Sequence, residues 1–122
     1  MTSQPMVVQG DVWWADLGQP VGSVPDYRRP VIIVQGGLLN GSRITTVICI
    51  PLTSNFDWEA VPTSLHLPAK ATGLDRDSVA QMSQIMTAER SQLIEQMGRI
   101  SARQLVQLLA KLDIALGRSG IS

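Results

Sequence analysis

The sequence predicts a mainly β fold, a small curved antiparallel sheet or barrel closed by one C-terminal α-helix. Several short stretches rich in β-branched residues are separated by turn-forming residues, and the apolar spacing becomes helical only after residue 100. The length of 122 residues suits a single domain. Short strands followed by one amphipathic helix are typical of such an architecture.

The first half of the chain contains two clear strand signals. A strand is expected over residues 7–16, with a bend near Gly10. A loop rich in Gly, Pro, Ser and Asp follows at residues 17–28. Residues 30–35 are a continuous β-branched run, which predicts a strand buried on both faces.

The middle of the chain predicts further antiparallel strands. The Asn-Gly pair at residues 40–41 is a strong signal for a tight hairpin turn. Another apolar strand is expected over residues 43–52, with Pro51 marking its exit from regular pairing. Shorter strands are expected at residues 63–67 and 78–87.

The C-terminal segment has the pattern of a capped helix. Ser101 is a suitable N-cap, Gln104 completes a capping box, and Gly117 is a suitable stop. One apolar stripe comprises Leu105, Leu108, Leu109, Leu112 and Leu116, and a second comprises Val106, Ala110 and Ile114. The first stripe predicts packing on the sheet, and the second is a weak indication of a partner.

Charge and cysteine content exclude several classes of protein. Ten basic residues balance ten acidic ones, so nucleic acid cannot be bound by bulk charge and would need a local groove. Cys49 is the only cysteine, which excludes an intrachain disulfide and predicts a buried, inert thiol. We expect no signal peptide and no membrane span, and therefore a cytoplasmic protein.

The residues give little support to metal, cofactor or triad chemistry, and none of these is expected. His66 is the only histidine and is interpreted as a structural or surface residue. Residues 75–77 (Asp-Arg-Asp) are interpreted as a solvated, self-paired loop. No Gly-rich phosphate-binding signature is present.

Two polar groups stand at predicted strand ends and remain open to two interpretations. Arg28 and Arg29 precede Pro30, and an arginine there is suited to grip phosphate, although solvated surface arginines are the commoner case. Residues 53–55 (Thr-Ser-Asn) follow the strand at 43–52 and could equally be turn residues. Trp58 is the best candidate for base stacking among the aromatic residues.

Taken in order, these blocks resemble the MazF/PemK (Kid) toxin family. The blocks are Gly10–Leu17, Val21–Ser23, Arg29–Gln35, Leu52–Ser54, Gly73–Val79, Gln84–Thr87 and Arg90–Leu93. The resemblance covers residues 10 to about 116. It implies a tail at residues 1–9, which includes the start of the first strand, and a single toxin domain over residues 10–118.

The resemblance also implies structure, partners and site residues. It implies an SH3-like or CcdB/PemK-type barrel, a homodimer, an RNA groove and a MazE-like antitoxin that occupies the same surface. Arg29 and Thr53 would be the catalytic pair. The residues expected to contact RNA are Ser23, Arg28, Ser54, Phe56, Trp58 and Gln84.

The reaction that the resemblance implies is metal-independent, sequence-specific cleavage of single-stranded RNA (mRNA). The ribose 2′-OH would attack the neighbouring phosphate to leave a 2′,3′-cyclic phosphate and a 5′-OH. The alternative is a non-enzymatic CcdB-like toxin that poisons DNA gyrase. Family members often carry an acidic residue and an arginine where this chain has Ser83 and Met86, so slower turnover or a different sequence choice is expected.

Overall fold

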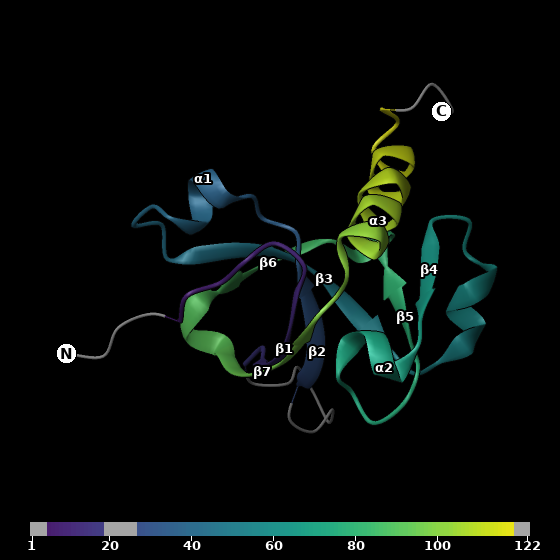
Figure 1. Cartoon of the computed structure of the whole chain (residues 1–122), viewed down its shortest axis with the longest axis horizontal. Helices are drawn as coiled ribbons and strands as arrows, with labels where there is room; N and C mark the ends of the chain where they lie inside the picture. The colour runs from purple at the N-terminus through teal and green to yellow at the C-terminus, as the bar shows by residue number, and fades with distance from the viewer. Residues whose placement is uncertain (1–4, 19–26, 119–122) are drawn as a thin grey trace.

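The computed structural model describes residues 5–18 and 27–118, which form one curved sheet with a C-terminal helix (Figure 1). The strands are β1 (Asp11–Asp16), β2 (Arg28–Ile33), β3 (Thr46–Thr53), β4 (Ser64–Leu67), β5 (Ser78–Gln81), β6 (Met86–Glu89) and β7 (Leu93–Arg99). The helices are α1 (Gly37–Asn40), α2 (Ala69–Thr72) and α3 (Ala102–Ala115). Three 3₁₀ turns are η1 (Phe56–Ala60), η2 (Met82–Gln84) and η3 (Arg90–Gln92).

The sheet has the strand order β4-β5-β3-β2-β1-β7, and every pairing in it is antiparallel. One edge of β3 carries β2, whereas the other carries β6 along its first half and β5 along its second half. The predicted mainly β class is therefore confirmed. Among the described strands the two ends, β4 and β7, do not pair, so the expected barrel is an open curved sheet.

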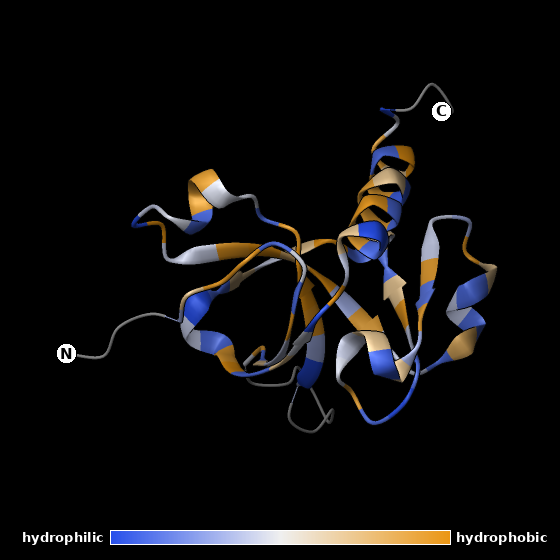
Figure 2. Cartoon of the chain, viewed as in Figure 1, coloured by the Kyte–Doolittle hydropathy of each residue, from blue (hydrophilic) through white to orange (hydrophobic). Residues whose placement is uncertain are grey.

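The sheet is buried on both faces, as the run at residues 30–35 predicts. Side chains alternate along β2 and β3 between two apolar clusters. Val31, Ile33 and Cys49 belong to one cluster, and Ile32 and Ile50 belong to the other. Figure 2 shows this as hydrophobic colour concentrated on the central strands and along part of α3.

The first strand is shorter than predicted because Gly10 turns the chain immediately before it. Gly10 has a φ of +97°, a left-handed conformation that glycine adopts without steric cost. Its N–H donates to the carbonyl of Ile33 at 2.7 Å, and its carbonyl accepts from Ile100 at 3.0 Å. The strand consequently begins at Asp11 rather than at Val7.

The predicted tight Asn-Gly turn is wrong. Residues 37–40 form α1, and Gly41 has a φ of −85° instead of the positive φ of such a turn. The Asn40 side chain donates to the carbonyl of Gln35 at 2.7 Å and accepts from the Gln35 amide at 3.0 Å. This paired amide contact favours a longer connection, although β2 and β3 still pair as an antiparallel hairpin.

Two further boundaries differ from the prediction. Pro51 lies inside β3, opposite Val31, where the second edge of β3 passes from β6 to β5. A residue without an N–H is tolerated at that changeover between partner strands. The single strand expected at residues 78–87 is divided into β5 and β6 by the turn η2.

The C-terminal helix begins as predicted. Ser101 accepts from the backbone N–H of Gln104, and both halves of the capping box are present. Leu108 is fully buried, and Leu105, Leu109 and Leu112 pack around the same cluster. Val106 of the second stripe is exposed, as is Leu116 at the end of the first.

Strand β7 is absent from the sequence-based expectation, yet it pairs with β1 along most of its length. Its sequence offers little periodicity, and most of its residues are exposed. Asp11 on β1 is buried and accepts from Arg99 at 2.6 Å and from Gln96 at 3.1 Å. These polar contacts add to the backbone pairing with β1 and to the packing of Leu93 and Met97 against the two apolar clusters. Across residues 5–18 and 27–118, no helix is long and apolar enough to cross a membrane.

Candidate active site

A cleft of about 560 Å³ lies where β2 begins and β3 ends. It is lined by Trp14, Tyr27, Arg28, Arg29, Pro30, Leu52, Thr53, Ser54, Leu74, Asp75, Arg76 and Ser78. Four of the residues expected from the sequence to bind or cleave RNA therefore share one cleft. Its lining combines apolar side chains with a few polar and charged ones, which is typical of a ligand site.

The sheet register places the two expected catalytic residues next to each other. Val31 lies opposite Pro51, and Ile33 lies opposite Cys49. Continuing this antiparallel register by two residues puts Arg29 opposite Thr53 on the same face. A guanidinium and a hydroxyl are thus presented side by side at the end of two neighbouring strands.

The Arg29 guanidinium is held by two side chains. Its Nη1 donates to the Tyr27 hydroxyl at 2.8 Å, and its Nη2 donates to Oε1 of Gln81 at 3.2 Å. The guanidinium carbon also lies 5.5 Å from the centroid of the Tyr27 ring. A guanidinium has five N–H donors, and the other three make no hydrogen bond to the described residues.

The neighbouring polar groups of the cleft are more exposed. Arg28 is paired across strands with Asp16 at 3.6 Å, and both side chains are about half exposed. The Thr53 hydroxyl accepts from the backbone N–H of Asn55 at 3.1 Å. This contact fixes the oxygen of Thr53 and leaves its proton able to donate to a ligand.

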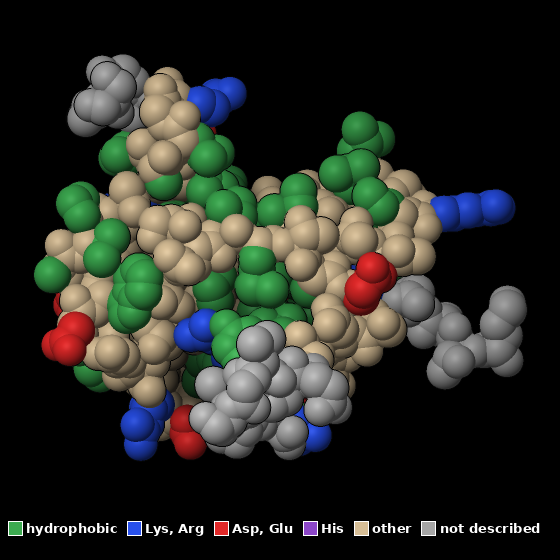
Figure 3. Space-filling model, turned by 180° about the vertical axis from the view of Figure 1, so that it is seen from behind, with side chains coloured by type: hydrophobic (Ala, Val, Ile, Leu, Met, Phe, Trp, Pro, Cys, Tyr) green, Lys and Arg blue, Asp and Glu red, His purple; other side chains and the backbone are tan. Residues whose placement is uncertain are grey.

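Three basic side chains line the cleft, against one carboxylate. Arg28, Arg29 and Arg76 provide the positive charge, and among the described residues Asp75 is the only acidic one in the lining. Viewed from behind, the molecule has a hollow lined with hydrophobic side chains, with basic side chains along its lower side (Figure 3). Local positive charge on a neutral chain is what the sequence analysis required for any nucleic-acid contact.

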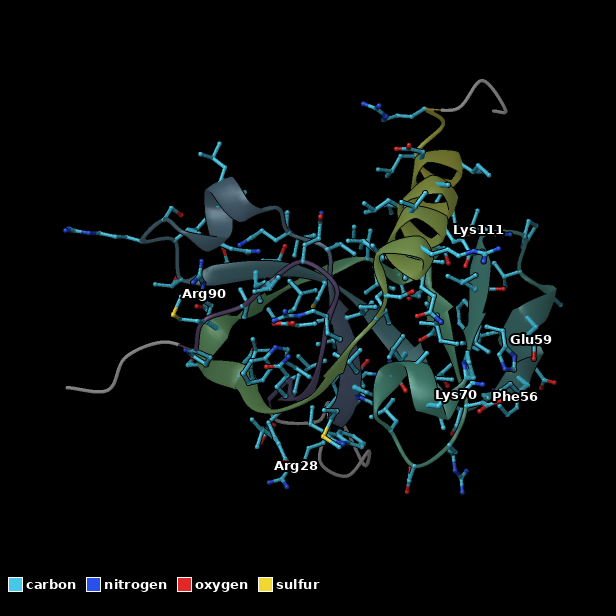
Figure 4. All side chains as sticks on the ribbon, viewed as in Figure 1. Arg28, Phe56, Glu59, Lys70, Arg90 and Lys111 are labelled. Carbon is cyan, nitrogen blue, oxygen red and sulfur yellow. The ribbon has the colours of Figure 1, made fainter. Side chains whose placement is uncertain are left out.

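Three other residues expected to bind RNA, Phe56, Trp58 and Gln84, do not line this cleft. Phe56 and Trp58 lie on η1, and Gln84 lies on η2. Figure 4 shows Phe56 and Glu59 together at one edge of the molecule, away from Arg28. Ser23 lies outside the described residues.

Phe56 stacks on His66, with ring centroids 5.7 Å apart and an interplanar angle of 19°. His66 is exposed on β4, in agreement with its interpretation as a surface residue. Its Nε2 lies 3.0 Å from a carboxylate oxygen of Asp77, and its Nδ1 lies 3.5 Å from Glu59. These groups link η1 to the segment that precedes β5.

The same contacts move two pKa values in opposite directions. The hydrogen bond to Asp77, with a smaller contribution from Glu59, raises the pKa of His66 above its ordinary value. The pKa of Asp77 is lowered, first by the backbone N–H of Ala69 and then by His66. Asp77 is thus a capping and pairing residue, whereas Asp75 and Arg76 face the cleft.

Other candidate groups lie away from the cleft. Cys49 is buried in the sheet, as predicted, and burial raises the pKa of its thiol to about 12. Of the two positions that depart from the family pattern, Ser83 is exposed on η2 and Met86 packs against the apolar cluster around Cys49. Within residues 5–18 and 27–118, no three His, Cys, Asp or Glu side chains are grouped so that they could hold a metal ion.

Several residues that line the cleft or support it were not identified from the sequence. Tyr27 and Gln81 hold Arg29, and Arg76 and Leu74 form part of the wall opposite β2. Gln81 had no visible signal because it lies within an apolar stretch and 52 residues from its partner. Tyr27, two residues before Arg29, was closer to detection as an aromatic neighbour of an arginine.

Comparisons with known proteins agree with this geometry. The family model described as PemK-like, MazF-like toxin of type II toxin-antitoxin system matches residues 8–116. Endoribonuclease MazF6 of Mycobacterium tuberculosis is 38% identical over 113 residues, covering 93% of this chain and 96% of that protein. Endoribonuclease EndoA of Bacillus subtilis is 31% identical over 112 residues, covering 91% and 95%.

Solved structures share the fold. A MazE-MazF structure from Deinococcus radiodurans superposes with a TM-score of 0.76 at 24% identity, covering 94% of this chain and 99% of that one. An endoribonuclease from a mycobacterial species gives a TM-score of 0.74 at 19% identity, covering 94% and 95%. The names of the two curated relatives favour the nuclease over the gyrase-binding alternative. The chain therefore belongs to the family of PemK-like, MazF-like toxins of type II toxin-antitoxin systems and is an endoribonuclease of that family.

Proposed function

We propose that this protein cleaves single-stranded RNA, mRNA in particular, at specific sequences without a metal ion. The observation that supports this most is that Arg29 and Thr53, at the ends of the adjacent strands β2 and β3, line one basic cleft. The nucleophile is supplied by the substrate, since a ribose 2′-OH lies next to each phosphate. The protein then has to hold the strand in line and stabilise the charge that grows on phosphate oxygens.

The proposed reaction forms one bond and breaks one. The 2′-oxygen bonds to phosphorus as the bond from phosphorus to the 5′-oxygen breaks, leaving a 2′,3′-cyclic phosphate and a 5′-OH. One proton leaves the 2′-oxygen and one is delivered to the departing 5′-oxygen. The products therefore balance without water or a cofactor.

Arg29 has the principal role in this scheme. A guanidinium is a donor without an acceptor, so Arg29 acts on the phosphate oxygens and the leaving group rather than as a base. Thr53 orients the phosphate or the 2′-OH through its hydroxyl. Loss of one donor of this kind costs on the order of 10²–10³ in rate. Arg29→Ala is expected in that range, and Thr53→Ala is expected to cost less.

The other proposed contacts extend the RNA path beyond the catalytic pair. Arg28 and Ser54 line the same cleft and are proposed to bind the adjoining phosphate and sugar. Phe56 and Trp58 lie on η1, shortly after Ser54, and are proposed to stack on bases further along the strand. Ser23 and Gln84 remain proposed RNA contacts.

We also propose a homodimer that acts in the cytoplasm and is neutralised by a MazE-like antitoxin. Structures of a mycobacterial endoribonuclease with its cognate antitoxin and of MazE-MazF from Deinococcus radiodurans support this, because both share the fold of this chain. A 2:1 or 2:2 complex measured by light scattering after coexpression would support it. A monomer at micromolar concentration would contradict the dimer.

The chemistry is tested with an RNA that carries one 2′-deoxynucleotide. After the cleavage sites in an all-ribose RNA are mapped, the nucleotide on the 5′ side of one cut is replaced by its deoxy form. Cleavage at that site is expected to disappear, while cuts elsewhere in the same strand continue. Continued cleavage at the deoxy position would exclude the 2′-oxygen as nucleophile.

A further inference from the structure

Behind the proposed catalytic arginine lies a buried glutamine that does not itself line the cleft. Gln81 is only 4% exposed, and its Oε1 accepts from Nη2 of Arg29 at 3.2 Å. The two residues come from strands on opposite edges of β3, so the contact spans that strand. Gln81 therefore touches the arginine from inside the protein, whereas any RNA would approach from the cleft.

The register explains how the two side chains meet. Leu52 pairs with Ala80, so one step further places Gln81 opposite Pro51, and Pro51 in turn lies opposite Val31. Gln81 and Arg29 consequently lie on one face of the sheet, offset by two residues along the strands. An extended arginine bridges such an offset, and the fixed strands leave its terminal nitrogen little freedom.

A second contact completes the restraint. Nη1 of Arg29 donates to the Tyr27 hydroxyl, so each terminal nitrogen has one fixed acceptor. A planar group held at two of its nitrogens has a defined orientation. Because Tyr27 is exposed and Gln81 is buried, the glutamine bond is the one shielded from competing water.

We infer that Gln81 is a positioning residue for the reaction, orienting the Arg29 guanidinium toward the scissile phosphate from behind. This inference rests on the proposed function. A neutral amide is suited to the task because it holds the guanidinium and leaves its full positive charge for the phosphate. A carboxylate at the same place would hold the arginine more strongly but would neutralise it.

The experiment compares Gln81→Leu with a matched control, Gln35→Leu. Gln35 is also a buried glutamine, 3% exposed, but its amide bonds to Asn40 and Thr46 near α1 and not to the cleft. Both variants lose a buried amide, so both are expected to have a lower Tm. Only Gln81→Leu is expected to lower kcat of the folded protein, by about tenfold with KM within about twofold.

A third variant adds a measurement, the pH dependence of the cleavage rate, that would not change if the role of Gln81 were purely structural. Gln81→Glu keeps an acceptor for Arg29 and introduces an ionisable group whose charged neighbour is Arg29. Its cleavage rate relative to the wild-type protein is expected to be low at neutral pH. The ratio is expected to rise as the pH falls, because protonation of the introduced carboxyl restores a neutral partner. This variant also serves as the test if Gln81→Leu does not fold.

The possible results distinguish failure of the role inferred for Gln81 from failure of the proposed RNA cleavage. If the wild-type protein cleaves RNA and Gln81→Leu retains its kcat while losing Tm, Gln81 is only structural and the inference is overturned. A Gln81→Glu variant that cleaves RNA at the wild-type rate at neutral pH would overturn it as well. If the wild-type protein does not cleave RNA at all, the proposed function fails first.

Discussion

Gly73 provides a prediction that can be worked out from the packing of α2 on β7. This residue ends α2 in the left-handed region, with a φ of +82°. A Cβ added there would overlap the backbone carbonyl of Met97 on β7. Two separate costs therefore act on Gly73→Ala, because the backbone conformation disfavours a side chain and a neighbouring backbone occupies its space.

Alanine substitutions at two other glycines measure those two costs separately. Gly98 has an ordinary φ, and its Cβ would lie 2.5 Å from the carbonyl oxygen of Thr72, so only the steric cost applies. Gly117 has a φ of +74°, and no described residue lies near its Cβ, so only the conformational cost applies. We expect a loss of unfolding free energy of about 1 kcal/mol for Gly117→Ala and about 1–3 kcal/mol for Gly98→Ala. Gly73→Ala should approach the sum of the two, about 2–4 kcal/mol.

Urea denaturation of the three variants measures these values. Gly73 leads directly into Leu74, Asp75 and Arg76, which line the cleft, so its variant is also expected to lose more cleavage activity than Gly117→Ala at equal folded fraction. If Gly73→Ala is no less stable than Gly117→Ala, the close approach of α2 and β7 does not exist in solution. The account of how that wall of the cleft is held would then be wrong.

Three further predictions concern stability. The pKa of His66 is raised, so the stability that its pairing with Asp77 provides is present below the unfolded-state pKa and is lost as the pH rises through the folded-state value. The wild-type protein should therefore show a shallow decline in Tm between about pH 6 and pH 8, which His66→Gln should remove. An unchanged decline in the variant would contradict the pairing with Asp77. Leu108→Ala should lower the unfolding free energy by about 2–5 kcal/mol, because Leu108 is 0% exposed. Val106→Ala, at a 68% exposed site, should change the unfolding free energy little. Equal losses of unfolding free energy, measured by urea denaturation, would show that α3 packs by another face. Ser101→Ala should cost about 1 kcal/mol through loss of the capping box, and a midpoint in urea equal to that of the wild-type protein would contradict this.

The parts of the fold with local signals were predictable. The cap at Ser101, the leucine stripe of α3 and the β-branched run of β2 each depend on neighbouring residues. The cap is confirmed, the stripe is confirmed except at Leu116, which is exposed, and the strand forms with its bounds at Arg28–Ile33 instead of 30–35. The Asn-Gly turn failed because the contact between Asn40 and Gln35 outweighs the local preference. Strand β7 was missed because its own sequence shows little periodicity, and the strand it pairs with, β1, is distant in the chain.

The candidate site likewise contains residues that could be identified from the sequence and residues that could not. Arg29 and Thr53 were identified because each belongs to a recognisable block, and the register then brings them together. Gln81 was not identified, because its role depends on how β5 is aligned with β3 and not on its own neighbours. Residues whose function arises only from long-range pairing carry no signal in a single sequence.

The central claim is metal-independent RNA cleavage that depends on Arg29, and one experiment tests it directly. The purified protein and its Arg29→Ala variant are incubated with a long single-stranded RNA in EDTA, and the 5′ ends of the fragments are mapped. The account predicts discrete cuts with 5′-OH ends in the wild-type reaction and a loss of about a hundredfold or more in the variant. Cleavage by Arg29→Ala at the wild-type rate, or fragments with 5′-phosphate ends, would contradict it.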